Sequence, residues 1–135
     1  MFRSSTSRFP ALGRSAAVAA TVLLGASGAV MTVTAPASAA SDSAQTVARE
    51  MVPAGQYACF SEIVERESGW DHTATNASSG AYGLVQALPA SKMASAGPDW
   101  KTNPATQIEW GLDYMNDRYG SPCGAWWFWQ ANHWY

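Results

Sequence analysis

The chain contains two segments whose hydrophobic positions repeat with the period of an α-helix. In the first, residues 54–68, apolar side chains recur at spacings of three and four residues. Pro53 interrupts whatever precedes this segment, and Gly69 follows it at the position of a left-handed C-terminal cap. These signals predict a helix over residues 54–68, whose apolar face consists of Tyr57, Phe60, Ile63 and Val64.

The second periodic segment follows the pair Asn103-Pro104. Asparagine is a good helix N-cap, and proline is favoured at the first helical position. Gly120 ends the pattern. We therefore predict a second helix between these two signals, with one face formed by Ile108, Leu112, Met115 and Tyr119.

Less regular sequence surrounds the two predicted helices. Residues 70–80 are mostly Asp, Thr, Asn, Ser and Gly, which favours a polar loop. Residues 81–88 are apolar and fit a short strand, a loop or a short helix, and one short helix is expected around residues 90–96. Residues 40–53 fit either a short helix or a loose segment, and we expect a flexible N-terminal arm. The pattern as a whole predicts a mainly α fold with a polar loop layer between two helices.

The N-terminal residues have the pattern of a secretory signal peptide. Three arginines precede residues 15–41, which carry no charge and are rich in Ala and Val. The small-x-small sequence Ala37-Ser38-Ala39 near the end of this stretch is typical of a signal peptidase site. A transmembrane anchor is the alternative, but low leucine content and Pro36 argue against it. We predict a signal peptide over residues 1–39 and a secreted chain with no stable membrane span.

Without the signal peptide the chain is acidic. Three of the eight basic residues lie before position 40 and all ten acidic residues follow it, so five basic residues remain against ten acidic ones. Such a chain has no electrostatic footprint for nucleic acid or anionic lipid. His72 and His133 have no metal-ligand spacing. The length of the chain predicts a single domain, over residues 54–135. We expect it to be monomeric and to use no metal or cofactor.

The only two cysteines are Cys59 and Cys123. An exported chain reaches an oxidising compartment, where two cysteines commonly form a bridge. A disulfide between them would close a long loop and contribute ~4 kcal/mol in the chain-entropy model. The alternative is a cysteine peptidase that uses Cys59 with His133.

Glu67 is the most informative polar residue of the first predicted helix. It lies four residues after Ile63 and three after Val64, so it projects from the apolar face. Burial and the negative end of the helix dipole both raise the pKa of such a carboxyl. A glutamic acid that keeps its proton near neutral pH can act as a general acid.

Two further features fit a ligand site, although the first, taken alone, fits a tight turn with a surface glutamine better. Gly80 and Gly83 allow close approach of the backbone in an apolar segment that ends at Gln86. All seven tryptophans follow residue 40, and their flat faces stack well on sugar rings. We expect two or three of them to face a ligand and the others to pack in the core.

Three sequence blocks follow one another along the chain. They are Glu67-Ser68-Gly69-Trp70, then Gly80-Ala81-Tyr82-Gly83-Leu84-Val85-Gln86, and then Gln107-Ile108 followed by Gly111-Leu112-Asp113-Tyr114-Met115. Together they resemble the catalytic domain of soluble lytic transglycosylases, the SLT-type members of the lysozyme-like superfamily, in their small secreted bacterial form. The similarity extends over residues 57–135.

The resemblance implies a compact α+β lysozyme-like domain with a glycan-binding cleft. It also implies that Glu67 cleaves the β-1,4 bond between N-acetylmuramic acid and N-acetylglucosamine in cell-wall peptidoglycan as a single general acid and base, giving 1,6-anhydromuramic ends. The tyrosine that bonds the catalytic glutamate in the family corresponds to Tyr114. The implied substrate contacts are Ser68, Tyr82, Gln86, Tyr114 and Trp126.

The sequence departs from the family pattern in several places. Val85 stands where methionine is usual, and Ala77 where serine often precedes the Gly-Ala pair, with Ser78 adjacent. The interval from the glutamate to the glutamine is one residue longer. The family's Ala-Tyr-Asn block near the C-terminus is missing, and Ala125-Trp126 stands in that region.

Two other functions remain open from the sequence. Glycoside hydrolysis usually needs two carboxylates, and Asp71 is the best second candidate for a lysozyme-like hydrolase. A wall-binding module without catalysis could use the Trp-rich end to hold glycan, although it would not need Glu67 on an apolar face.

Overall fold

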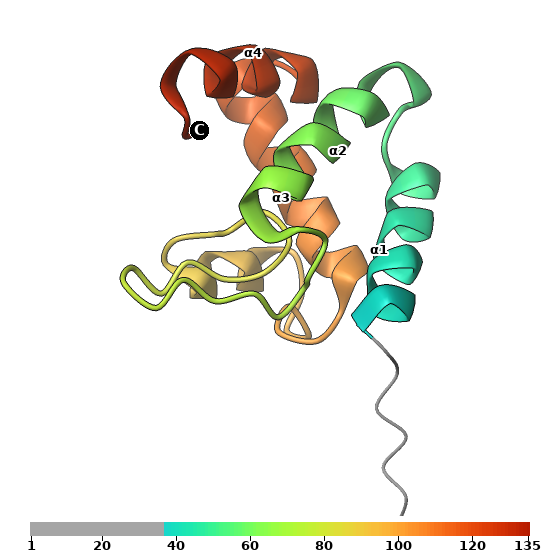
Figure 1. The fold of residues 1–135 in the computed structure, drawn as a ribbon, viewed down its shortest axis with the longest axis vertical. Helices are drawn as coiled ribbons and strands as arrows, with labels where there is room; N and C mark the ends of the chain where they lie inside the picture. Colours follow the sequence, from blue (N-terminus) through green and yellow to red (C-terminus); the bar gives the residue numbers. More distant parts are fainter. Residues whose placement is uncertain (1–36) are drawn as a thin grey trace, which may run out of the picture. The chain divides into compact units, whose positions relative to one another are not determined.

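The computed structural model describes residues 37–135 as a helical domain with one irregular loop layer (Figure 1). The predicted signal peptide lies outside the described residues, apart from its last three positions. None of the described helices has the length and hydrophobicity that a membrane crossing demands. The elements are α1 (Ala37–Met51), α2 (Ala54–Ser68), the short 3₁₀ helix η1 (Ala90–Ser95), α3 (Pro104–Tyr119) and α4 (Pro122–Asn132).

Helices α2 and α3 begin and end where the sequence predicts. Gly69 adopts the left-handed conformation (φ 58°), and its amide donates to the carbonyl of Glu65. Asn103 caps α3, since its side-chain oxygen accepts from the amide of Ala105 at 3.0 Å. The expected short helix near residue 90 is present as η1.

The expected flexible arm over residues 40–53 is wrong, because most of this segment belongs to α1. Ala44 and Ala48 are completely buried, and Val52 is 3% exposed. Helix α1 packs on α3 and α2. Alanine side chains are small enough to let two helices approach closely, so a segment with few large apolar residues still contributes to the core.

Helix α4 was not predicted. It contains the aromatic run, begins with Pro122 at the first position, and is capped by Ser121, whose hydroxyl accepts from the amide of Gly124 at 2.9 Å. The helix packs on α2 and α3. Only part of its aromatic surface enters the core, since Trp127 is 70% exposed.

A disulfide joins α2 to α4, as the two cysteines predict. Cys59 and Cys123 are bonded, with their Cα atoms 4.9 Å apart. Both cysteines of the chain are in this bridge, so neither is available as a nucleophile. The cysteine-peptidase alternative is therefore excluded.

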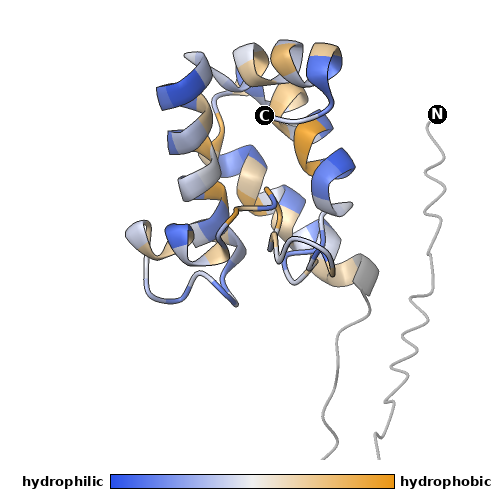
Figure 2. Ribbon diagram, turned by 90° about the vertical axis from the view of Figure 1, so that its left-hand side faces the viewer, coloured by the Kyte–Doolittle hydropathy of each residue, from blue (hydrophilic) through white to orange (hydrophobic). Residues whose placement is uncertain are grey.

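The core lies between the helices and the loop layer. In Figure 2 the hydrophobic turns face the neighbouring helices and the hydrophilic turns face outward. Large side chains from four segments meet there with essentially no exposed surface. They are Phe60, Ile63, Trp70, Leu84, Met93, Ile108 and Met115.

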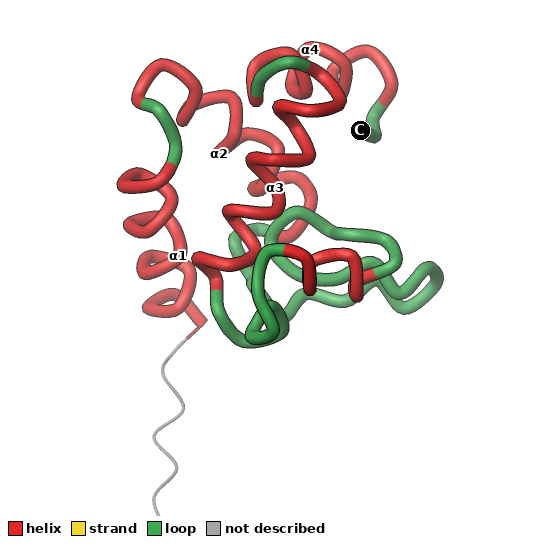
Figure 3. The backbone as a smooth tube through the Cα atoms, turned by 180° about the vertical axis from the view of Figure 1, so that it is seen from behind, coloured by secondary structure: helices red, strands yellow, loops and turns green. Residues whose placement is uncertain are grey.

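The residues between α2 and α3 form a layer of loops and η1 at one end of the helices (Figure 3). Residues 81–88 are loop: Tyr82 forms isolated bridges with Thr75 and Ala87, but no strand. The layer approaches α3 closely, because a Cβ added at Gly111 would lie 2.7 Å from Val85 Cγ1. Val85, at the position where the family has methionine, thus packs directly on α3.

Gln107 of α3 holds the loop layer together from the inside. Its side chain is completely buried, and its amide nitrogen donates to the carbonyls of His72 and Trp100, both at 2.9 Å. Its amide oxygen accepts from the backbone of Leu84 at 2.8 Å. One buried side chain therefore fixes three separate parts of the loop layer against α3, which sets the position of the glycine-rich segment.

Candidate active site

Glu67 lies half-buried in the last turn of α2, opposite helix α4. The indole nitrogen of Trp129 donates a hydrogen bond of 2.8 Å to its Oε1 atom. Burial raises the pKa of Glu67 above its ordinary value of 4.5, and the bond from Trp129 partly offsets this rise by favouring the ionised form. The withdrawal of this carboxyl from water, expected from the helical pattern, is present in the structure.

Trp129 is held by a stack of flat groups. Its ring lies on that of Trp126, with centroids 5.5 Å apart and planes 20° from parallel. The guanidinium of Arg66 lies over both rings, 4.8 Å from the centroid of Trp126 and 5.5 Å from that of Trp129. Trp126, an implied substrate contact, thus supports the residue that bonds Glu67.

Ser68 connects α2 to the glycine-rich segment. Its hydroxyl donates to the carbonyl of Leu84 at 2.7 Å and lies 3.1 Å from the carbonyl of Val64. These contacts fix the end of α2, and therefore Glu67, relative to the loop. Ser68 was an implied substrate contact, and its hydroxyl hydrogen is used within the protein.

Tyr82 and Gln86 also bond to the protein itself. The hydroxyl of Tyr82 donates to the carbonyl of Lys101 at 2.7 Å. The amide nitrogen of Gln86 donates to the carbonyls of Ala74, at 3.0 Å, and Gly83, at 2.9 Å. These bonds hold the turns of the loop layer and leave the oxygen atoms of both side chains as the groups that could meet a ligand.

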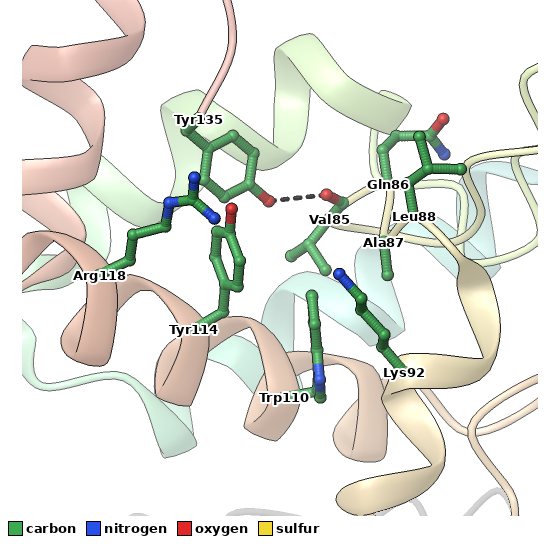
Figure 4. A pocket seen from close by; sticks show the side chains of 9 residues that line it. All are labelled: Val85, Gln86, Ala87, Leu88, Lys92, Trp110, Tyr114, Arg118 and Tyr135. Carbon is green, nitrogen blue, oxygen red and sulfur yellow. Dashed lines mark hydrogen bonds between the residues drawn. The ribbon is translucent and has the colours of Figure 1, made fainter. Parts of the chain in front are cut away.

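A pocket of about 240 Å³ lies between the glycine-rich segment and α3. One side is formed by residues 85–88, and the other by side chains of α3 (Figure 4). Tyr135 closes one end, because its hydroxyl donates to the carbonyl of Val85 at 2.6 Å. Its ring meets that of Tyr114 edge-on, with centroids 5.5 Å apart.

Tyr135, which lines this pocket, is affected by the charge of Glu67. Burial raises the pKa of Tyr135 well above its ordinary value, and the negative charge of Glu67 contributes to the rise. Glu67 itself is not among the residues that line either described pocket. The end of α2 that carries Glu67 is connected to the pocket wall through Ser68, which donates to the carbonyl of Leu84, the neighbour of the pocket-lining Val85.

The implied bond between Tyr114 and Glu67 is not among the hydrogen bonds of residues 37–135. Tyr114 instead stacks on Trp110, with centroids 5.2 Å apart, and lines the pocket. The hydrogen bond to Glu67 comes from Trp129, on a different helix. This is a correction to the role that the resemblance implied for Tyr114.

Asp71 is occupied in a turn. Its Oδ1 atom accepts from the amide of Thr73 at 2.9 Å and from the Thr73 hydroxyl at 2.8 Å. These bonds lower the pKa of Asp71, so the carboxylate is stabilised in its ionised form. An exposed carboxylate that caps a local turn has a structural role.

Trp129, Tyr135 and Gln107 were not singled out from the sequence as individual residues of the site. Gln107 could have been found by the argument used for Glu67, since it lies four residues before Gly111 and eight before Met115, which are both buried. Trp129 and Tyr135 could not, because their contacts span 62 and 50 residues. Within residues 37–135 no group of three potential ligands could hold a metal ion.

Comparison with known proteins supports the resemblance of the three sequence blocks. A family model described as the transglycosylase SLT domain matches residues 48–132, which include all three blocks. Neither the curated proteins nor the solved structures provide a match.

Proposed function

Because the chain belongs to the transglycosylase SLT domain family, we propose that it is a lytic transglycosylase that cleaves the β-1,4 bond between N-acetylmuramic acid and N-acetylglucosamine in peptidoglycan. The observation that carries this proposal is the carboxyl of Glu67, which is half-buried and has a raised pKa and one indole donor. A carboxyl of this kind is protonated over a wider pH range than an exposed glutamate, as a general acid must be.

In the proposed reaction Glu67 acts twice. It first donates its proton to the glycosidic oxygen, and the bond from that oxygen to the anomeric carbon of muramic acid breaks. The N-acetyl group of the substrate stabilises the positive charge that develops there. The Glu67 carboxylate then takes the proton of the C6 hydroxyl, whose oxygen attacks the anomeric carbon, so that a 1,6-anhydro ring forms and Glu67 regains its proton.

The environment of Glu67 suits both steps. Burial favours the protonated form that starts the reaction, while the Trp129 indole stabilises the carboxylate that follows bond cleavage. No second carboxylate is needed, which agrees with the role of Asp71 in its turn. We further propose that the chain is secreted and acts as a monomer at the cell wall, where the disulfide would form.

The first test is Glu67→Gln. Gln keeps the shape of the side chain and can still accept from Trp129, but it cannot donate the required proton. We expect release of soluble fragments from purified sacculi to fall about 10²–10⁴-fold, with an unchanged circular dichroism spectrum. Glu65→Gln is the matched control, because Glu65 is exposed on the same helix. Cleavage by the folded Glu67 variant at the wild-type rate would assign the acid elsewhere.

The second test identifies the ends of the products. Mass spectrometry of digested sacculi should find 1,6-anhydromuramic ends, which are lighter than reducing ends by one water molecule. Reducing ends alone would instead support a lysozyme-like hydrolase, and Asp71→Asn would then be the first variant to examine. Binding to sacculi without any released fragments would support a wall-binding module.

A further inference from the structure

The basic residues of this acidic domain are unevenly distributed. From residue 40 onward the chain has five basic residues and ten acidic ones. Two of those five, Lys92 of η1 and Arg118 of α3, line the same pocket of about 240 Å³. No Asp or Glu side chain is among its lining residues.

Neither of the two cations is neutralised by an ion pair. Among residues 37–135 the one ion pair joins Arg66 to Glu62, on α2. Asp113 and Asp117 line an adjoining pocket that also contacts Arg118, but no ion pair with Arg118 forms. The lining of the pocket that Lys92 and Arg118 share therefore carries two positive charges and no negative one, in a domain whose net charge is negative.

The walls of this pocket suit a sugar. Trp110 and Tyr114 form a stacked pair, and Arg118 lies 5.5 Å from the centroid of the Tyr114 ring. Figure 4 shows the Lys92 amine and the Arg118 guanidinium on either side of this aromatic pair. The facing wall is formed by residues 85–88 of the glycine-rich segment and the turn that follows it.

The position of the pocket relates it to the proposed reaction. Ser68, the residue after Glu67, donates to the carbonyl of Leu84 at 2.7 Å, and Val85, the residue after Leu84, lines the pocket. A glycan strand that passes Glu67 would thus place a neighbouring sugar or its substituent at the pocket. The aromatic wall would contact the sugar, and the two cations would favour an anionic substituent.

We propose that Lys92 and Arg118 bind a carboxylate carried by the N-acetylmuramic acid units, so that this pocket selects muramyl strands over neutral glycans. The inference rests on the proposed function for its substrate class. The carboxylate is either that of the lactyl ether or that of an attached stem peptide. A strand made only of N-acetylglucosamine has neither group.

Binding of ligands that the protein cannot cleave tests this proposal without relying on activity. Titrations followed by amide and indole chemical shifts would compare N-acetylmuramic acid, muramyl dipeptide and N-acetylglucosamine. We expect the neutral sugar to bind at least about fivefold more weakly than the better of the two anionic ligands. The anionic ligand that binds more tightly identifies the lactyl or the peptide carboxylate.

Variants that each remove one of the two positive charges provide a second test of the proposal. Lys92→Gln and Arg118→Gln should each weaken binding of the preferred anionic ligand about fivefold, and added salt should reduce the difference from wild type. Lys101→Gln and Arg49→Gln are the matched controls, because these cations are exposed and lie outside the pocket. All four variants change exposed side chains, and thermal melts would verify that they fold.

The outcomes separate this inference from the proposed function. Equal binding of anionic and neutral sugars, or equal effects of the pocket and control variants, would overturn the role of Lys92 and Arg118 even if sacculi are cleaved. Charge-dependent binding by a protein that releases no fragments would uphold the pocket and overturn the catalytic proposal.

Discussion

At the scale of single residues, the proposed chemistry depends on two opposing influences on the pKa of one carboxyl. Burial raises the pKa of Glu67, and the Trp129 indole lowers it. Glu62 and Glu65, on the same helix, are exposed to solvent. A group that must give up a proton and then take one back benefits from such a balance, since neither form is stabilised at the full expense of the other.

Removal of the indole donor should shift the pH dependence of cleavage. In Trp129→Phe the ring stack can remain, but the bond that favours the ionised form of Glu67 is lost, so its pKa rises further. The alkaline limb of the rate profile should therefore move to higher pH, and kcat at the optimum should fall about tenfold. Initial rates on sacculi across the pH range would measure both effects.

Trp127→Phe is the control for this variant, because Trp127 belongs to the same helix and is 70% exposed. It should leave the profile in place. A Trp129 variant whose rate falls equally at every pH would show that Trp129 only supports the fold.

The sequence allowed Glu67 to be identified but not its donor. Glu67 departs from a local pattern, since a carboxyl falls on a face otherwise formed by Phe60, Ile63 and Val64. Trp129 is one of several aromatic residues in its segment. What distinguishes it is the hydrogen bond to Glu67, which lies 62 positions earlier in the chain. Local periodicity carries no information on a pairing at that separation.

At the scale of elements, the glycine-rich segment depends on its close approach to α3. Gly83 has φ +82°, and a Cβ there would lie 2.6 Å from Gln107 Oε1. Gln107 is fixed by bonds to three backbone groups, so it cannot move aside cheaply. The segment that lines the pocket is thus specified by one glycine and one buried amide together.

Gly83→Ala should therefore be strongly destabilising. Overpacking against Gln107 and the unfavourable positive φ together cost about 2–4 kcal/mol. Urea denaturation would measure the loss in the free energy of unfolding. Gly55→Ala is the contrasting substitution: no atom lies within 4 Å of a Cβ there and the residue is in the first turn of α2, so the free energy of unfolding should change by no more than about 0.5 kcal/mol. Equal effects of the two substitutions would contradict this account of Gly83.

The elements differ in how well the sequence predicted them, for a physical reason. Helices α2 and α3 each have one apolar face and clear end signals, so their bounds follow from pattern and capping. Helix α1 buries alanines, which do not stand out in a segment of small residues. Helix α4 is aromatic on nearly all sides, so its residues show no period.

At the scale of the whole molecule, one covalent bond joins distant parts of a short chain. The disulfide spans 64 residues and connects α2 with α4. A domain of this size buries only a moderate share of its surface, so restriction of the unfolded chain is a substantial part of its stability.

Loss of the bridge should lower the free energy of unfolding by about 4 kcal/mol. Urea denaturation of the Cys59→Ala/Cys123→Ala variant against the oxidised wild type would measure this difference. Reductant should lower the stability of the wild type to a similar extent and leave the double variant unchanged. A wild type that resists reductant while the double variant is weakened would assign the loss to packing.

The disulfide also bears on when the protein could become catalytically active. The helices it connects, α2 and α4, are the same two that bring Glu67 to Trp129. Under the proposed export, the chain is made where thiols stay reduced and reaches an oxidising environment only afterwards. Glu67 and its donor Trp129 would then be held together only after the disulfide forms outside the cell. The protein would therefore become active where its proposed substrate, the cell wall, is found.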